Sequence, residues 1–250
     1  MKQPRIPKGV FLFSVGLLAT WLVTGCDAGG EPTPAPSGDA AQAPKGPAKK
    51  VEVGKNVFLE VQGERRLVRV NAYVCLRKGQ LEQLLTRKRT KEHEAVLAAD
   101  VDARLIHAAL TLARAEPGKP VQFVPKFVPP SGSTIKVSLE YVDPQTKKTV
   151  KVPANKWIRN LKSKKHLETD WVFAGSVLID DPLDKTKKPF YAANDGDIIC
   201  LSNFDTAMLD LPVSSSRENN DLVFEADTDR IPPVETPVQV ILEPIAKMKK

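Results

Sequence analysis

The stretch Leu67-Val68-Arg69-Val70-Asn71-Ala72-Tyr73-Val74 decides the fold class, because its β-branched and aromatic residues predict a β-strand. A second predicted strand, Asn56-Val57-Phe58-Leu59-Glu60-Val61, comes shortly before it. Gly63 lies in the short connection between them, where a turn is needed. We therefore expect the two segments to pair as a β-hairpin.

Alternation of apolar and polar residues indicates a second hairpin further along the chain. Residues 135–141 alternate between the two kinds, Asp143-Pro144 follows as a turn, and Val150 and Val152 resume the alternation. This hairpin is expected to bury one face. Further strands are predicted over residues 95–97, 171–179, 198–202, 222–226 and 238–242, with Asp195-Gly196-Asp197 as a tight turn before the third of these.

Two segments have helical patterns. Asp100 or Asp102 can cap a helix over residues 103–115, which has a broad apolar face and ends at Pro117-Gly118. A weaker pattern predicts a second helix over residues 154–164. Several strands packed against one or two helices define an α+β fold. We therefore predict a single β-rich domain with one or two packed helices.

The N-terminus has the pattern of a bacterial secretion signal. Three basic residues stand within the first eight, and residues 10–23 carry no charge. This run is shorter than the roughly 20 residues of a membrane-spanning helix. It ends in Val23-Thr24-Gly25-Cys26, which resembles the lipobox of bacterial lipoproteins. We predict a signal peptide over residues 1–25, lipid attachment at Cys26, and export to the extracytoplasmic (periplasmic or outer) side of a bacterial membrane. The alternative is a chance cysteine beside an ordinary cleavage site.

Composition divides the rest of the chain into a tether and a domain. Residues 26–50 hold five prolines among small and polar residues, with hardly any bulky apolar side chain, so they cannot build a core. We expect a disordered linker there. Residues 51–250 are evenly apolar and long enough for a single globular domain.

Charge argues against a nucleic-acid partner. The chain has 37 Lys and Arg against 30 Asp and Glu, and residues 1–25 hold three of the basic residues and no acidic one, which leaves +4 in the mature chain. The short basic runs have acidic neighbours and few aromatic residues for stacking. The expected partners are the membrane, through the N-terminal lipid, and an unknown envelope protein or ligand.

Cysteine and histidine residues suggest two possible sites. Cys75 and Cys200 remain after lipidation of Cys26, and in an oxidising compartment they form either a disulfide or two separate thiols. His93 and His107 could meet across a strand and a helix, with Glu92, Glu94 or Cys75 completing a zinc or copper site. The alternative is that His107 fills a half-buried helix position with a hydrogen bond, while the neighbours of His93 solvate a loop. We expect no cofactor.

Catalytic motifs give no positive sign of an enzyme. His93-Glu94-Ala95-Val96-Leu97 has leucine where a zincin helix needs its second histidine. Gly175-Ser176 is followed by Val177, which breaks the pattern of a serine-hydrolase elbow. Asp195 and Asp197 flank a glycine and are expected to form a turn. No catalytic residue is assigned.

Several short segments resemble the YdjY-domain family of bacterial envelope proteins. They include Cys75-Leu76-Arg77-Lys78-Gly79, residues 91–97 and Leu209-Asp210-Leu211-Pro212, and the similarity spans most of residues 55–245. The resemblance implies an exported or lipid-anchored domain of unassigned role. Its motifs contain Cys75, His93, Glu94 and His107, which makes them the place to look for a site. Some members of the family carry a ferredoxin-like label. We do not extend an iron-sulfur role to this chain, because a four-iron cluster needs about four cysteine ligands and only Cys75 and Cys200 remain after lipidation.

The sequence thus favours a lipid-anchored extracytoplasmic domain that binds a partner or ligand without catalysing a reaction. A metal-binding or redox accessory protein using Cys75, His93 and His107 is the alternative.

Overall fold

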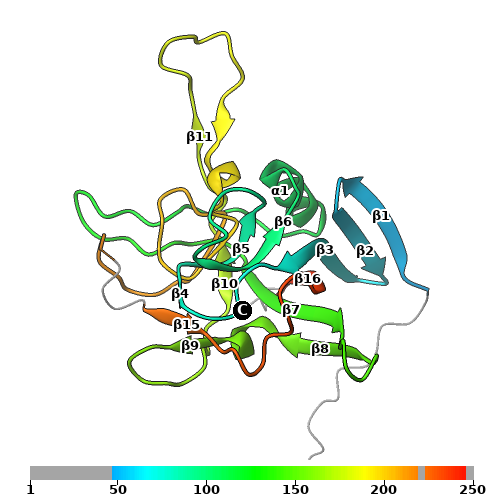
Figure 1. Cartoon of the computed structure of the whole chain (residues 1–250). Helices are drawn as coiled ribbons and strands as arrows, with labels where there is room; N and C mark the ends of the chain where they lie inside the picture. Colours follow the sequence, from blue (N-terminus) through cyan, green and yellow to red (C-terminus); the bar gives the residue numbers. More distant parts are fainter. Residues whose placement is uncertain (1–46, 219–222, 246–250) are drawn as a thin grey trace, which may run out of the picture. The chain divides into compact units, whose positions relative to one another are not determined.

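Eight strands of the protein close into a β-barrel (Figure 1). The structure is a computed structural model, and it describes residues 47–218 and 223–245. Around the barrel each strand pairs with the next, and the last, β6, pairs back onto the first, β3. In order around the barrel the strands are β3 (Arg65–Val74), β16 (Pro237–Pro244), β7 (Thr134–Val142), β10 (Trp171–Phe173), β14 (Leu209–Asp210), β13 (Ile199–Cys200), β5 (Gln83–Arg87) and β6 (Ala95–Ala99).

Other strands extend this frame. β1 (Lys49–Gly54) and β2 (Val57–Gln62) continue the sheet beyond β3, and β8 (Thr149–Pro153) pairs with β7. Two smaller sheets stand apart from it. One joins β4 (Gln80–Leu81), β15 (Phe224–Ala226) and β9 (Ile158–Asn160), and the other joins β11 (Leu178–Ile179) to β12 (Phe190–Tyr191).

The α+β prediction is therefore wrong. A single α-helix, α1 (Ala103–Leu112), occurs among the described residues, and it packs on β1, β2 and β3 while the barrel supplies the core. The physical reason is the pairing of Tyr73 with Ala98 and of Val74 with Leu97, which turns an open sheet into a closed one. Strand composition alone does not reveal such a closing pair.

Both predicted hairpins are confirmed. In the first, Val57 pairs with Val70 across β2 and β3, and Gly63 lies in the turn with a positive φ of 58°. In the second, Tyr141 pairs with Val150 across β7 and β8. β3 and β7 bury alternate residues where they cover the core, whereas β2 is half-buried over most of its length and β8 has no buried residue.

Two helix predictions have different outcomes. α1 is confirmed, and Asp102 rather than Asp100 is its N-cap, because the Asp102 carboxylate accepts the backbone N–H of Arg104 at 3.0 Å. The helix over residues 154–164 is wrong. Only a 3₁₀ turn, η1 (Ala154–Trp157), forms there, since Ile158 then pairs with Ala226 and the backbone continues as β9.

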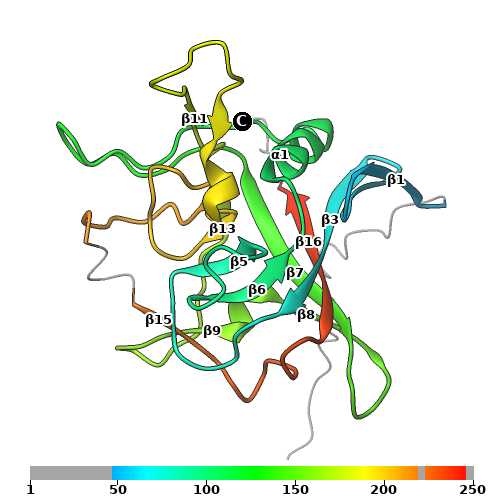
Figure 2. The same ribbon diagram turned by 45° about the horizontal axis from the view of Figure 1, so that its top comes forward.

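The predicted strand over residues 171–179 is broken in the middle. β10 ends at Phe173, and Gly175 and Ser176 have positive φ angles of 91° and 57° before β11 begins. β11, β12 and the loop between them, residues 177–191, form a projection that we call the arm; it is yellow in Figure 1 and Figure 2. The break thus creates the arm.

The predicted signal peptide and Cys26 lie outside the described residues. β1 begins at Lys49, two residues before the expected start of the domain at residue 51. Among residues 47–218 and 223–245, no helix is both long enough and apolar enough to cross a bilayer.

The closing strand generates a stability prediction. Leu97 on β6 is fully buried and pairs with strands on both sides, so Leu97→Ala should lower the free energy of unfolding by about 2–5 kcal/mol through lost burial and a cavity. Leu112→Ala is the matched control, because Leu112 is 57% exposed. Denaturant unfolding measures both, and equal effects would contradict a closed core around Leu97.

Candidate functional site

An apolar pocket of about 450 Å³ lies where the arm meets α1. Three elements build it: one face of α1, the break after β10, and the base of the arm. Volumes of this order suit a small ligand, and pockets that bind ligands are mostly apolar with a few placed polar groups. The lining residues are Arg104, His107, Ala108, Gly175, Ser176, Val177, Leu178 and Tyr191.

His107 is the central polar residue of the pocket. Its Nδ1 lies 2.9 Å from the Tyr191 hydroxyl, and that hydroxyl donates to the Gly175 carbonyl at 2.9 Å. Because the only phenolic proton goes to Gly175, the His107 Nδ1–H must donate to the Tyr191 oxygen. Burial lowers the pKa of His107, so its ring is neutral at neutral pH.

The pocket wall opposite α1 depends on the backbone at Gly175 and Ser176. A Cβ on Gly175 would come within 3.0 Å of the Pro117 Cβ, and its φ of 91° also favours glycine. The Ser176 hydroxyl donates to the Thr206 carbonyl at 2.6 Å and accepts the Ala193 N–H at 3.0 Å. Ser176 is therefore a fixed structural link, with its hydroxyl already engaged on both sides.

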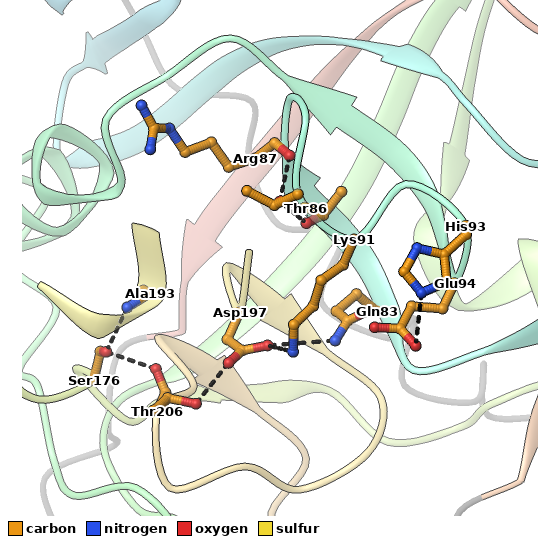
Figure 3. Close-up of polar contacts among 11 residues, drawn as sticks. Gln83, Thr86, Arg87, Lys91, His93, Glu94, Ser176, Ala193, Asp197 and Thr206 are labelled. Atoms are coloured by element: carbon orange, nitrogen blue, oxygen red, sulfur yellow. Dashed lines mark hydrogen bonds and ion pairs between the residues drawn. The ribbon is translucent and has the colours of Figure 1, made fainter. Parts of the chain in front are cut away.

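Behind that wall lies a buried ionic cluster centred on Asp197, shown in Figure 3. Asp197 is 4% exposed, and its carboxylate accepts from Lys91 Nζ at 2.7 Å, Thr206 Oγ1 at 2.6 Å and Gln83 Nε2 at 3.3 Å. Burial alone would lower the pKa of Lys91, but the hydrogen bond and charge of Asp197 outweigh it and raise the pKa. This contact ties the loop at Lys91 to the pocket wall.

A second network fixes the helix end of the pocket. The Asn194 side chain accepts the Ala103 N–H at 2.8 Å and donates to Asp102 at 3.0 Å. Hydrogen bonds from Arg104 to Asp102 lower the pKa of that carboxyl to about 2. Asn194 belongs to the 3₁₀ turn η2 (Ala192–Asp195), which follows β12, so the arm and α1 are joined at their bases.

Asp210 is a buried acid beside this region. Its Oδ1 accepts from Asn203 Nδ2 and from the Leu211 N–H, each at 2.8 Å, whereas Oδ2 is buried with no partner. Burial raises the pKa of Asp210 to about 7. A carboxyl with this pKa is about half protonated at pH 7.

The structure separates most residues that the sequence singled out. Cys75 follows β3 and its thiol donates to the Ala95 carbonyl at 3.1 Å, while burial raises its pKa to about 12. Cys200 is buried on β13, and both thiols are free rather than joined. Burial raises the pKa of Cys200 as well.

His93 and His107 also have different environments and share no contact partner among the described residues. His93 is exposed, with Nε2 3.7 Å from the Glu94 carboxylate, whereas His107 is half-buried and bonded to Tyr191. Over the described part of the chain, no three His, Cys, Asp or Glu residues gather as metal ligands would. His107 thus occupies the hydrogen-bonded helix position of the second interpretation.

Sequence reasoning missed Tyr191 and the pocket itself. Gly175-Ser176 had been considered only as a broken hydrolase motif, yet the glycine and the residue after it shape the wall. Asp195-Gly196-Asp197 does form a turn, with Gly196 at a φ of 122°, but Asp197 also carries the buried ion pair. Nothing in the local pattern distinguishes it from Asp195.

Fold and pocket together define a closed β-barrel domain with a ligand-sized apolar pocket beside its helix. The chain belongs to the YdjY domain family, whose model matches residues 59–243, from β2 to β16. This confirms the resemblance found in the sequence, and the family has no assigned biochemical role. Searches of the curated proteins and of the solved structures found no significant match.

Asp210 generates a pH prediction. Its pKa is raised in the fold, so the protonated carboxyl stabilises the protein fully below about pH 4, and this contribution is lost as pH rises towards 7. Asp210→Asn keeps the Oδ1 acceptor and cannot ionise. The free energy of unfolding of the variant, relative to the original chain, should therefore increase by on the order of a few kcal/mol between pH 4 and pH 8. Chemical unfolding at each pH measures both proteins. If their free energies of unfolding changed with pH by the same amount, the raised pKa of Asp210 would be contradicted.

Proposed function

We propose that the protein is a binding module of the bacterial cell envelope that accommodates the apolar part of a ligand in the pocket beside His107. A lipid on Cys26 would hold it to the membrane on the extracytoplasmic side. The single observation that carries the binding role is the pocket: an apolar cavity with preset walls, lined by a neutral, hydrogen-bonded histidine.

The walls support binding rather than catalysis. The Ser176 hydroxyl is engaged with Thr206 and Ala193, and the Tyr191 proton is engaged with Gly175. Neither is poised as a nucleophile or acid. Arg104, which is exposed and paired with Asp102, is the one Lys or Arg among the lining residues. A ligand with an apolar body and an acidic or polar end therefore fits best.

The anchor rests on the sequence. A basic leader, an uncharged run and the lipobox-like Val23-Thr24-Gly25-Cys26 together support lipidation, and residues 27–46 supply a proline-rich tether. Such a tether allows the barrel to stand tens of ångströms from the acyl chains, at about 3 Å per residue where it is extended.

The anchor is tested by Cys26→Ser in the full chain. Loss of the acyl attachment should move the protein from the membrane fraction to the soluble fraction after cell fractionation, and metabolic labelling with a fatty-acid analogue should disappear. Cys75→Ser is the control, because that thiol lies in the barrel and should leave both readouts unchanged. Tight membrane association of the Cys26 variant would reject the anchor.

The pocket is tested with 8-anilinonaphthalene-1-sulfonate, a fluorescent probe with an apolar body and an anionic group. A soluble chain of residues 47–250, first shown to unfold cooperatively, is titrated with it. Ala108→Trp places a large side chain in the pocket from an exposed helix position, and should weaken probe binding about tenfold, or about 1.4 kcal/mol.

Leu112→Trp is the matched control, since Leu112 is exposed on the same helix but does not line the pocket. It should bind the probe as the unsubstituted chain does. Equal affinities for both variants would show that the probe binds elsewhere, and the pocket assignment would fail.

A further inference from the structure

The loop between α1 and β7 carries an ordered apolar tip that the core does not use. Gln122 and Val128 exchange backbone hydrogen bonds of 3.0 and 2.7 Å, and the Ser131 N–H donates to the Lys119 carbonyl at 2.9 Å. These bonds hold residues 119–131, which we call the 119–131 loop, as a narrow projection (Figure 2). Backbone hydrogen bonds within the loop therefore fix its shape.

The side chains at this tip are apolar and open to solvent. Val124 is 68% exposed and Val128 39% exposed. The Phe123 and Phe127 rings contact each other at 6.0 Å between centroids and lie outside the hydrophobic core cluster. An ordered loop that exposes two valines and leaves two phenylalanines only half-buried outside the core loses part of the stabilisation that burial would give, which favours a surface that covers it.

Charge favours an anionic surface. The 119–131 loop contains Lys119 and Lys126 and no acidic residue, and the Arg217 guanidinium lies 5.6 Å from the Phe123 ring centroid. Apolar tips surrounded by cations suit the interface of a bilayer that contains anionic lipids, where the lysines meet headgroups and the apolar groups enter the acyl boundary.

The arm carries a second exposed apolar side chain. Leu183, in the loop between β11 and β12, is 96% exposed, and in the same loop the Lys187 ammonium is paired with Asp181 at 2.8 Å. Its three aspartates and three lysines balance, so the arm adds apolar contact without net repulsion. In Figure 1 the arm projects from the top of the barrel and the 119–131 loop from its left side, and in both views the turn between β7 and β8 lies at the lower right, away from the two (Figures 1 and 2).

We propose that the barrel docks on the membrane through these two tips, with Val124 of the 119–131 loop and Leu183 of the arm in the lipid interface. The proposal rests on the anchoring proposed above, which keeps the barrel within reach of the bilayer. Two separate convex tips fit a soft, continuous surface better than a folded protein partner, which would need a complementary hollow for each.

The experiment places a fluorescent reporter at each tip of the full, lipidated chain. Val124→Cys and Leu183→Cys are labelled with a nitrobenzoxadiazole dye and reconstituted by the lipid anchor into vesicles of phosphatidylcholine and phosphatidylglycerol. Val142→Cys is the matched control, because Val142 is 55% exposed beside the turn between β7 and β8. The unsubstituted chain measures background labelling of Cys75 and Cys200.

Nitroxide-labelled lipids should reduce the fluorescence at positions 124 and 183 by about half and leave position 142 unchanged, since only the tips enter the interface. The reduction at position 124 should be smaller in vesicles of phosphatidylcholine alone. Vesicle-bound protein without quenching at either tip overturns the docking and leaves the anchor intact, as does equal quenching at all three positions. Protein that does not float with the vesicles overturns both proposals.

Discussion

The pairing of β6 with β3 is the interaction on which the rest of the structure depends. Two residue pairs, Tyr73 with Ala98 and Val74 with Leu97, convert a curved sheet into a barrel whose interior is sealed from water. α1 follows β6 after only a few residues, so closure also fixes where the helix begins. Since His107 lies on that helix, the position of the pocket follows from the closing pair.

Buried charge links this frame to the pocket wall. Lys91 comes from the segment that precedes β6, and its ion pair with Asp197 reaches the turn after η2. Thr206 then connects Asp197 to Ser176, which borders the pocket. Removing Lys91 would leave the buried Asp197 carboxylate without its cation, so this arrangement tolerates little displacement. Barrel, pocket wall and arm are therefore held in register by polar contacts as well as by apolar packing.

The local sequence pattern was sufficient to predict the two hairpins and α1. It was insufficient for segments whose structure depends on partners far away in the chain. Residues 135–141 alternate because one face of β7 is buried, so the period of two is visible in the sequence. Ile158 pairs with Ala226, a partner far away in the chain, and that contact overrides the helical pattern of residues 154–164. Cys26 lies outside what the structure describes. Among the site residues His107 was identified, but Tyr191 could not be, because its role depends on a loop break that brings Gly175 under its hydroxyl.

The place of β16 in the barrel has a consequence for how the chain acquires its structure. This last strand lies between β3 and β7, and it pairs residues near position 240 with residues near position 70. Contacts of such long sequence separation form slowly, because much of the chain must be ordered before they contribute. The barrel cannot be completed until the C-terminal strand has left the ribosome. Until residues 237–244 are available, β3 and β7 lack the strand that joins them, so the barrel stays open along that seam.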